Sequence, residues 1–255
     1  MKKTCLITGA SRGIGFATAL ALAEEGFDIA AVALPDTQRM SLLRQKVSAC
    51  GRRFSAYELD LGQVDQHAAL IARVIDDFGA IECLVNNAGV SVLSRGDLLE
   101  VSEQSFDHCF AVNTRGTFFF TQAVARHMAA TQTPAGSYRS IVFVTSSNAV
   151  AATVERGEYC MSKTALSMAC KLFALRLAGH GIAVFEVQPG LRLTEMTAPS
   201  KARYDDLIAA GMTIDQRWGL PEDVARVVRT MVSGLLPYTI AQEVRVDGGL
   251  LLTRF

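Results

Sequence analysis

Residues 8–15 read Thr8-Gly9-Ala10-Ser11-Arg12-Gly13-Ile14-Gly15, and this stretch decides the fold. It follows a short apolar run and opens a segment whose apolar residues recur at helical spacing. Glycines permit a tight turn and a close approach of backbone to phosphate, and the positive end of the following helix favours negative charge. The spacing Gly-x-x-x-Gly-x-Gly therefore predicts a phosphate-binding strand–loop–helix unit, with a glycine turn that binds nothing as the alternative.

Beyond this unit, apolar runs alternate with helical segments along the whole chain. The predicted strands are Cys5–Thr8, Ile29–Ala33, Phe54–Glu58, Cys83–Asn86, Ser140–Thr145, Ala183–Gln188 and Glu243–Val246. The predicted helices are about Gly13–Glu25, Gln38–Cys50, Val64–Phe78, Glu103–Ala130, Glu158–Ala178 and Pro221–Ser233. This alternation predicts an α/β fold, a doubly wound (Rossmann-type) seven-stranded parallel sheet with helices on both faces. We expect a single domain over residues 1–255, with the irregular stretch 192–218 as a helical substrate flap.

Composition excludes several classes of function. Lys and Arg number 25 and balance 25 Asp and Glu, so no basic excess exists to bind nucleic acid. No apolar stretch approaches the ~20 residues that span a bilayer, so we expect no membrane partner. The six cysteines and four histidines are scattered without metal-ligand spacing, which favours reduced thiols, a cytoplasmic location and no metal site.

A second pattern carries chemistry, namely Tyr159-Cys160-Met161-Ser162-Lys163 in a predicted helix. A separation of four residues places Tyr159 and Lys163 on one helical face. A free phenol titrates near pKa ~10, and a nearby ammonium lowers that value. The pair thus predicts a tyrosine able to transfer protons, although such pairs also occur as simple surface neighbours.

Together, the motifs resemble the short-chain dehydrogenase/reductase family over essentially the full chain. The motifs occur in the family's order: the glycine loop, Asn86-Asn87-Ala88-Gly89, Ser146, the Tyr159–Lys163 pair thirteen residues later, and Pro189-Gly190. The closing segment, Arg217–Ala225 through Val246–Gly249, is similar to the bacterial 3-oxoacyl-acyl-carrier-protein reductase branch. The resemblance implies an NAD(P)-dependent oxidoreductase that interconverts a carbonyl and a secondary alcohol, assembled as a homotetramer or homodimer.

The resemblance also implies four catalytic roles. Asn113 would hold a water that joins Lys163 to solvent, and Ser146 would hydrogen-bond the substrate oxygen. Tyr159 would exchange a proton with that oxygen, and Lys163 would bind the nicotinamide ribose and depress the pKa of Tyr159. Taken alone, Asn113 is better interpreted as a helix-kinking amide, and Ser146 as a strand-end cap.

For the cofactor, the resemblance implies that it binds across the carboxyl ends of the first and fourth strands, at the point where the strand order reverses. The residues are Gly9, Ser11, Arg12, Gly13, Ile14, Gly15, Asp60, Leu61, Asn87, Ala88, Gly89, Tyr159, Lys163, Pro189, Gly190 and Thr194. Relatives that use NAD often carry an acid at the end of the second strand, where this chain has Ala33-Leu34-Pro35. Arg12 is either a partner for a 2′-phosphate, which favours NADP(H), or a solvated loop charge. A loop that brings Asp36 to the ribose favours NAD(H) instead.

Two questions stay open at the substrate end. Arg192 stands where similar proteins usually carry an aliphatic residue, and its side chain points either at the substrate or at solvent. The substrate is a 3-oxoacyl thioester in the first interpretation and a sugar or polyol in the second. A third interpretation, from another class, is a dinucleotide-binding regulatory module without chemistry.

Overall fold

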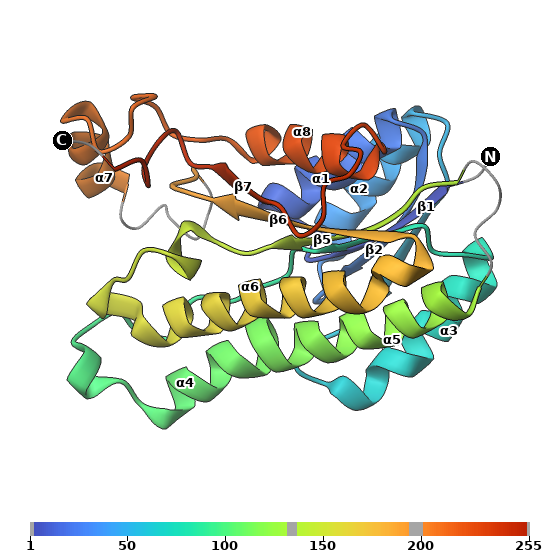
Figure 1. Ribbon diagram of the computed structural model, residues 1–255, viewed down its shortest axis with the longest axis horizontal. Coiled ribbons are helices and arrows are strands. Elements are labelled where there is room, and N and C mark those ends of the chain that lie inside the picture. The colour runs from blue at the N-terminus through green and yellow to red at the C-terminus, as the bar shows by residue number, and fades with distance from the viewer. Residues whose placement is uncertain (1–2, 132–136, 194–200, 254–255) are drawn as a thin grey trace.

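The computed structural model describes residues 3–131, 137–193 and 201–253, and it contains one parallel sheet of seven strands (Figure 1). The strands are β1 (Lys3–Thr8), β2 (Phe27–Ala33), β3 (Phe54–Glu58), β4 (Cys83–Asn86), β5 (Arg139–Val144), β6 (Ile182–Pro189) and β7 (Glu243–Val246). Their order is β3-β2-β1-β4-β5-β6-β7, with every neighbouring pair parallel. The predicted doubly wound, seven-stranded sheet is confirmed.

The strand order reverses between β1 and β4, which lie side by side although they are far apart in sequence. Loops that follow these two strands leave in opposite directions and open a crevice between them. The glycine loop after β1 and the Asn-rich loop after β4 therefore face each other at one edge of the sheet. This is where a doubly wound sheet places its ligand.

Helices cover both faces of the sheet (Figure 1). One layer holds α1 (Gly13–Glu24), α2 (Thr37–Ala49) and α8 (Pro221–Val232). The other holds α3 (His67–Phe78), α4 (Glu103–Cys109), α5 (Thr117–Ala130) and α6 (Gly157–Leu177). The shorter elements are η1 (Val64–Gln66), η2 (Leu98–Glu100), η4 (Ser147–Ala149), η5 (Val154–Arg156), η6 (Ala178–His180) and α7 (Lys201–Ala209).

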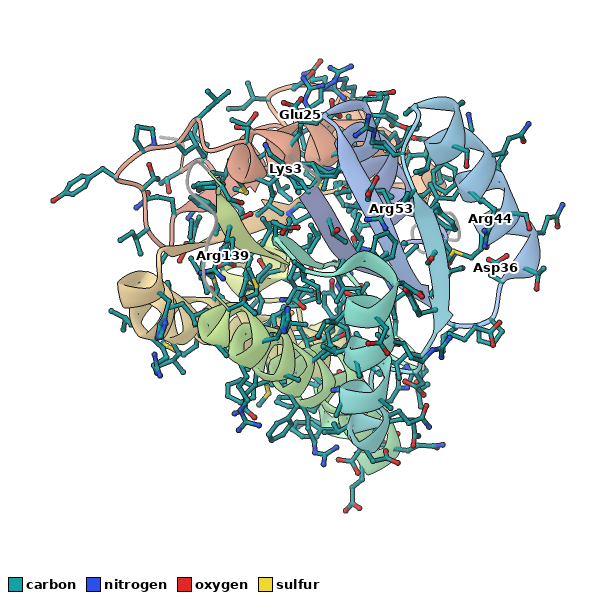
Figure 2. All side chains as sticks on the ribbon, turned by 90° about the vertical axis from the view of Figure 1, so that its right-hand side faces the viewer. Lys3, Glu25, Asp36, Arg44, Arg53 and Arg139 are labelled. Atoms are coloured by element: carbon teal, nitrogen blue, oxygen red, sulfur yellow. The ribbon has the colours of Figure 1, made fainter. Side chains whose placement is uncertain are left out.

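The alternation of side chains along each strand divides the core into two layers. In β1, Ile7 packs with the α1 and α8 side, whereas Leu6 packs with the α5 and α6 side. Both are completely buried, and each such side chain stabilises the fold by about 1.5–3 kcal/mol. Other charged residues lie at the surface, as Figure 2 shows for Asp36, which caps α2, and for Arg44 of α2 at the outer edge of the molecule.

The predicted single helix Glu103–Ala130 is wrong in one respect, because it contains a π-helical segment. The segment η3 (Phe110–Gly116) separates α4 from α5. Gly116 lets this segment pack directly against the backbone at Leu61, since a Cβ on Gly116 would lie 2.3 Å from the carbonyl oxygen of Leu61. Wide turns of this kind re-aim a side chain and are frequent at functional sites, and here the side chain is that of Asn113.

Candidate active site

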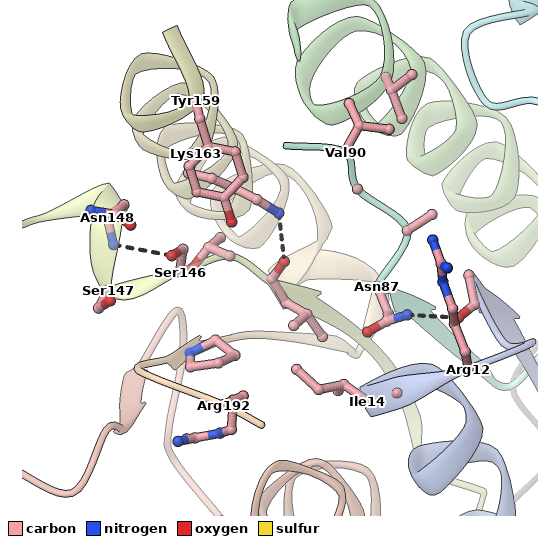
Figure 3. A pocket seen from close by; sticks show the side chains of 18 of the residues that line it. Arg12, Ile14, Asn87, Val90, Ser146, Ser147, Asn148, Tyr159, Lys163 and Arg192 are labelled. Atoms are coloured by element: carbon pink, nitrogen blue, oxygen red, sulfur yellow. Dashed lines mark hydrogen bonds between the residues drawn. The ribbon is translucent and has the colours of Figure 1, made fainter. Parts of the chain in front are cut away.

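A cleft of about 1090 Å³ opens at the carboxyl ends of the strands, and Figure 3 shows side chains that line it. Most of the predicted site residues line this cleft. They are Gly9, Ser11, Arg12, Gly13, Ile14, Asp60, Leu61, Asn87, Ala88, Gly89, Ser146, Tyr159, Lys163, Pro189 and Gly190. Gly15 and Asn113 lie behind its wall, and Thr194 lies outside the described residues.

The glycine loop has a geometry that only glycine permits. Gly9 has a φ of +67°, in the left-handed region. A Cβ on Gly15 would lie 2.1 Å from the carbonyl oxygen of Gly9 and 2.5 Å from Nδ2 of Asn87. The loop thus brings bare backbone to the N-terminus of α1, where unpaired N–H groups and the helix dipole attract phosphate. These residues fit the pyrophosphate of a dinucleotide.

The loop after β4 is fastened to the loop after β1. Nδ2 of Asn87 donates to the carbonyl oxygens of Thr8 at 3.0 Å and Gly9 at 3.1 Å. In return, the Thr8 hydroxyl accepts from the backbone N–H groups of Asn87 and Ala88, at 3.0 and 3.1 Å. Asn87 therefore shapes the crevice with its side chain, rather than forming a simple turn.

The acids near the expected adenosine end are both engaged in local structure. Oδ1 of Asp60 accepts from the backbone N–H of Gly62 at 2.9 Å, while the residue also lines the cleft. Asp36 caps α2, because its Oδ1 accepts from the N–H of Arg39 at 3.1 Å. Its Oδ2 pairs with the Arg39 guanidinium at 3.3 Å. Arg12 and Arg39 also line this part of the cleft.

Tyr159 and Ser146 meet at the other end of the cleft (Figure 3). Ser146 follows β5, and its Oγ accepts from the N–H of Asn148 at 3.1 Å, as expected of a strand-end cap. Burial raises the pKa of Tyr159, and the hydrogen bond with Ser146 and the charge of Arg156 oppose that rise without cancelling it. The pKa of Tyr159 therefore lies above its ordinary value in this structure, and not below it as expected. The phenol is held protonated at neutral pH.

Lys163 lies beneath the phenol, with 3% of its surface exposed. Its Nζ lies 5.8 Å from the centroid of the Tyr159 ring and donates to the carbonyl oxygen of Val144 at 3.3 Å. Burial lowers the pKa of Lys163 to about 8, although the charge of Glu186 opposes this effect. The ammonium is thus still charged at neutral pH, but it loses its proton within the pH range in which enzyme activity is commonly measured.

Asn113, in the π-helical segment, lies close to Lys163, and both side chains approach Gly89. Its Oδ1 accepts from the N–H of Val90 at 2.8 Å, and its Nδ2 donates to Val90 O and Ser162 Oγ, both at 3.0 Å. A Cβ on Gly89 would lie 3.1 Å from Asn113 Oδ1 and 3.2 Å from Lys163 Nζ. The side chain of Asn113 is therefore committed to protein groups in this structure.

Arg192 lines the cleft with a nearly buried side chain and does not point into open solvent. The side chain is 5% exposed, and its Nη1 donates to the carbonyl oxygen of Leu191 at 2.9 Å. It lies across Gly219, where a Cβ would come within 1.8 Å of Nη1. Burial lowers its pKa, and the charges of Asp223 and Asp247 counter that effect. Arg192 thus packs the segment that returns at Gly219 against the end of β6.

Some cleft residues are not singled out by the sequence, although their segment is. Tyr204, Leu207 and Met212 line the cleft from α7 and the turn after it, within the stretch 192–218 expected as a flap. The Tyr204 ring meets Trp218 edge to face at 6.0 Å, and Trp218 Nε1 donates to Asp205 at 2.6 Å. The sequence shows both aromatic residues in the irregular stretch. Only the tertiary fold shows that their rings are in contact.

Comparison with known proteins identifies the family. Residues 3–205 match the family model described as short chain dehydrogenase.

The chain belongs to the short-chain dehydrogenase/reductase family.

Among relatives, a 2-dehydro-3-deoxy-D-gluconate 5-dehydrogenase of Dickeya dadantii is 33% identical over 98% of this chain and 95% of the relative. A 3-oxoacyl-[acyl-carrier-protein] reductase of Thermotoga maritima is also 33% identical, over 98% of both chains. A 3-oxoacyl-[acyl-carrier protein] reductase from Brucella melitensis, solved in complex with NAD, is 40% identical, with a TM-score of 0.94 over 100% of this chain and 99% of the other. This short-chain dehydrogenase/reductase is therefore an NAD(P)-dependent oxidoreductase that acts on small carbonyl or alcohol substrates.

Two further findings concern the described part of the chain. None of its helices has both the length and the apolar character needed to cross a membrane. Within the same residues, no group of three or more His, Cys, Asp or Glu side chains is arranged to hold a metal ion.

Proposed function

We propose that this enzyme reduces a 3-oxoacyl thioester, with NADP(H) as the cofactor and Tyr159 as the proton donor. The observation that carries the proposal is the meeting of Tyr159 and Ser146 at one end of a dinucleotide-sized cleft, above the buried Lys163. The glycine loop at the other end supports the same orientation of the cofactor.

The chain's own residues supply the acid and the positioning. A bound nicotinamide would supply the hydride. The Ser146 and Tyr159 hydroxyls both donate to the substrate oxygen, and these donors stabilise charge that develops there. The Tyr159 proton then passes to that oxygen. Lys163 places a positive charge beneath the phenol, so that the phenolate is less costly as it forms.

Reduction suits the protonation states of the site better than oxidation. The raised pKa keeps the Tyr159 phenol protonated, as a general acid must be before the reaction. Oxidation would need the phenolate at the start. The enzyme is thus prepared for the carbonyl substrate in its resting state.

Preference for NADP(H) is supported by the end of β2. Leu34 occupies the position where an acid would bond the ribose hydroxyls, and both oxygens of Asp36 are engaged by α2 and Arg39. Arg12 and Arg39 bring two guanidinium groups to the same part of the cleft. We expect kcat/KM for NADPH to exceed that for NADH, and a preference for NADH would contradict this assignment.

A thioester with an acyl chain is supported by the apolar wall of the cleft. The apolar residues that line it include Leu193, Leu207, Met212, Leu250 and Leu251. We propose that the segment 192–218, through its described part, acts as a flap over this substrate.

A sugar acid is the second candidate, because one cation stands beside the phenol. The Arg156 guanidinium lies 5.4 Å from the centroid of the Tyr159 ring and lines the cleft. It is placed to bind a substrate carboxylate, and the Dickeya relative is named for a sugar-acid substrate. Replacing Arg156 with Gln should raise KM for a keto sugar acid but not for a neutral diketone.

Self-association is supported by an exposed apolar stripe on α6. Met161, Met168, Leu172 and Leu175 recur at helical spacing, and Phe119 of α5 is exposed as well. We propose that these residues pack against a second copy, in a homotetramer or homodimer. Light scattering of Leu175→Glu, whose side chain is 78% exposed in the parent, should report a smaller particle.

One screen tests the proposed function. Oxidation of NADPH and of NADH is followed with acetoacetyl-CoA, neutral diketones, 3-keto acids and keto sugar acids. Turnover of the thioester with NADPH is the expected result. Turnover of the sugar acid alone would favour the second candidate, and no turnover with any carbonyl would favour a regulatory dinucleotide-binding module.

A further inference from the structure

Glu186 is a buried carboxylate to which the mechanism above assigns no role. It lies on β6 with 0% of its surface exposed. Oε1 accepts from the Thr145 hydroxyl at 2.6 Å and from Gln188 Nε2 at 2.9 Å. Oε2 accepts from the Ser167 hydroxyl at 2.7 Å. Three donors on two oxygens provide the partners that a buried acceptor-only carboxylate requires.

The same hydrogen bonds connect Glu186 to the surroundings of Lys163. Thr145 directly follows Val144, whose carbonyl oxygen accepts from Lys163 Nζ at 3.3 Å. Ser167 lies one turn beyond Lys163 on the same face of α6, so the two side chains are neighbours. Glu186 is thus fixed to both elements that hold the lysine, the end of β5 and the inner face of α6.

Lys163 needs a counter-charge because its ammonium is buried, and the other ionisable groups nearby do not provide one. These groups are Cys109 of α4, Arg156 of η5, Glu158, Tyr159, Cys160, Cys170 and Lys171 of α6, and Glu243 of β7. Burial raises the pKa of the Cys109 thiol to about 11, so that group is neutral. Glu158 is hydrogen-bonded to Ser105 at 2.6 Å and is not among the charges that raise the pKa of Lys163, and Glu243 forms an ion pair with Lys171 at 2.7 Å.

We propose that Glu186 is a positioning residue whose buried carboxylate is the fixed counter-charge of the Lys163 ammonium, and thereby keeps that ammonium charged beneath Tyr159. This inference rests on the proposed function of Tyr159 and Lys163. It extends that function to a residue that acts on Lys163 and does not contact the substrate. The electrostatics agree with the geometry, since the Glu186 charge opposes the fall that burial imposes on the pKa of Lys163. A buried cation that loses its counter-charge gives up its proton more readily.

The test is the pH profile of carbonyl reduction by the full-length Glu186→Gln enzyme saturated with NADPH. Glutamine has the same shape, and its oxygen can still accept from Thr145 and Gln188. In the parent, activity should fall as pH rises through about 8, the pKa of Lys163. In Glu186→Gln we expect that fall about one pH unit lower, with activity at pH 6 within about threefold of the parent.

Glu243→Gln is the matched control, because it removes the neighbouring carboxylate that pairs with Lys171 at the surface. Its profile should superimpose on that of the parent. A Glu186→Gln profile that also superimposes, or that is lowered equally at every pH, would overturn the proposal. If Glu186→Gln does not fold, Glu186→Asp is measured instead, since its charge lies farther from the lysine. Its fall should then come between pH 7 and 8, and an unchanged position would overturn the proposal.

A second measurement separates this proposal from the proposed function. Lysine labelled with ¹³C at Cε reports the titration of Lys163 by NMR, with the signal assigned by its loss in Lys163→Arg. The midpoint should be lower in Glu186→Gln than in the parent, whichever carbonyl the enzyme reduces. If no carbonyl is reduced but the midpoint shifts, the proposed function fails while the role of Glu186 stands. An equal midpoint in the two proteins would refute that role alone.

Discussion

Replacing Gly15 with Ala tests whether the loop after β1 is built for a dinucleotide. The added Cβ would lie 2.1 Å from the Gly9 carbonyl oxygen, whereas ordinary contact begins at 3.4 Å, so the loop must move by about 1.3 Å. Overpacking of this kind costs about 1–3 kcal/mol. If the displaced loop has to return for binding, this corresponds to a dissociation constant about 5 to 150 times higher.

The assay is calorimetric titration of NADPH and NADH into the folded variant. Gly179→Ala is the control, because nothing lies within 4 Å of its added Cβ and the position has no positive φ. It should bind both dinucleotides as the parent does. Unchanged affinity in folded Gly15→Ala would refute the claim that this loop carries the pyrophosphate.

Three other predictions follow from the same structure. Ser146→Ala removes one of two donors to the substrate oxygen and should lower kcat by about 10²–10³-fold in steady-state assays, whereas a loss below about fivefold would contradict its role. Because Lys163 is charged only below its pKa of about 8, kcat/KM for reduction should fall about tenfold between pH 7 and pH 9, and a flat profile would count against the lysine. Phe143→Ala empties a fully buried position that stacks on Phe173 at 6.0 Å, so urea unfolding should show a loss of about 3–5 kcal/mol. A loss under 1 kcal/mol would mean that the core around β5 repacks.

The sheet could be predicted from the sequence because its signals are local. Each buried strand reads as a short apolar run, and each helix as a period of 3.6 residues. The order of the glycine loop, Ser146 and the Tyr159–Lys163 pair further located the cleft, since the carboxyl ends of parallel strands meet at one edge. These features need no knowledge of which segments touch.

The remaining features depend on contacts between distant segments. In the π-helical segment, the Asn113 side chain is hydrogen-bonded to Val90 and Ser162, which lie far away in the sequence. No local sequence pattern predicts this segment. The sequence allows Asp36 to reach the ribose, whereas in the structure its carboxylate caps α2. Glu186 read as one polar residue in a predicted strand, and only the fold places it next to the helix that carries Lys163.

The most direct test of the whole account is Tyr159→Phe, which removes one hydroxyl and keeps the ring beside Ser146. Carbonyl reduction and NADPH binding are measured on the same preparation. We predict that kcat falls by at least about 10²-fold, while the dissociation constant for NADPH stays within about threefold of the parent. Undiminished turnover would contradict the assignment of the acid, and a loss of NADPH binding equal to the loss of rate would show that Tyr159 holds the cofactor instead of transferring the proton.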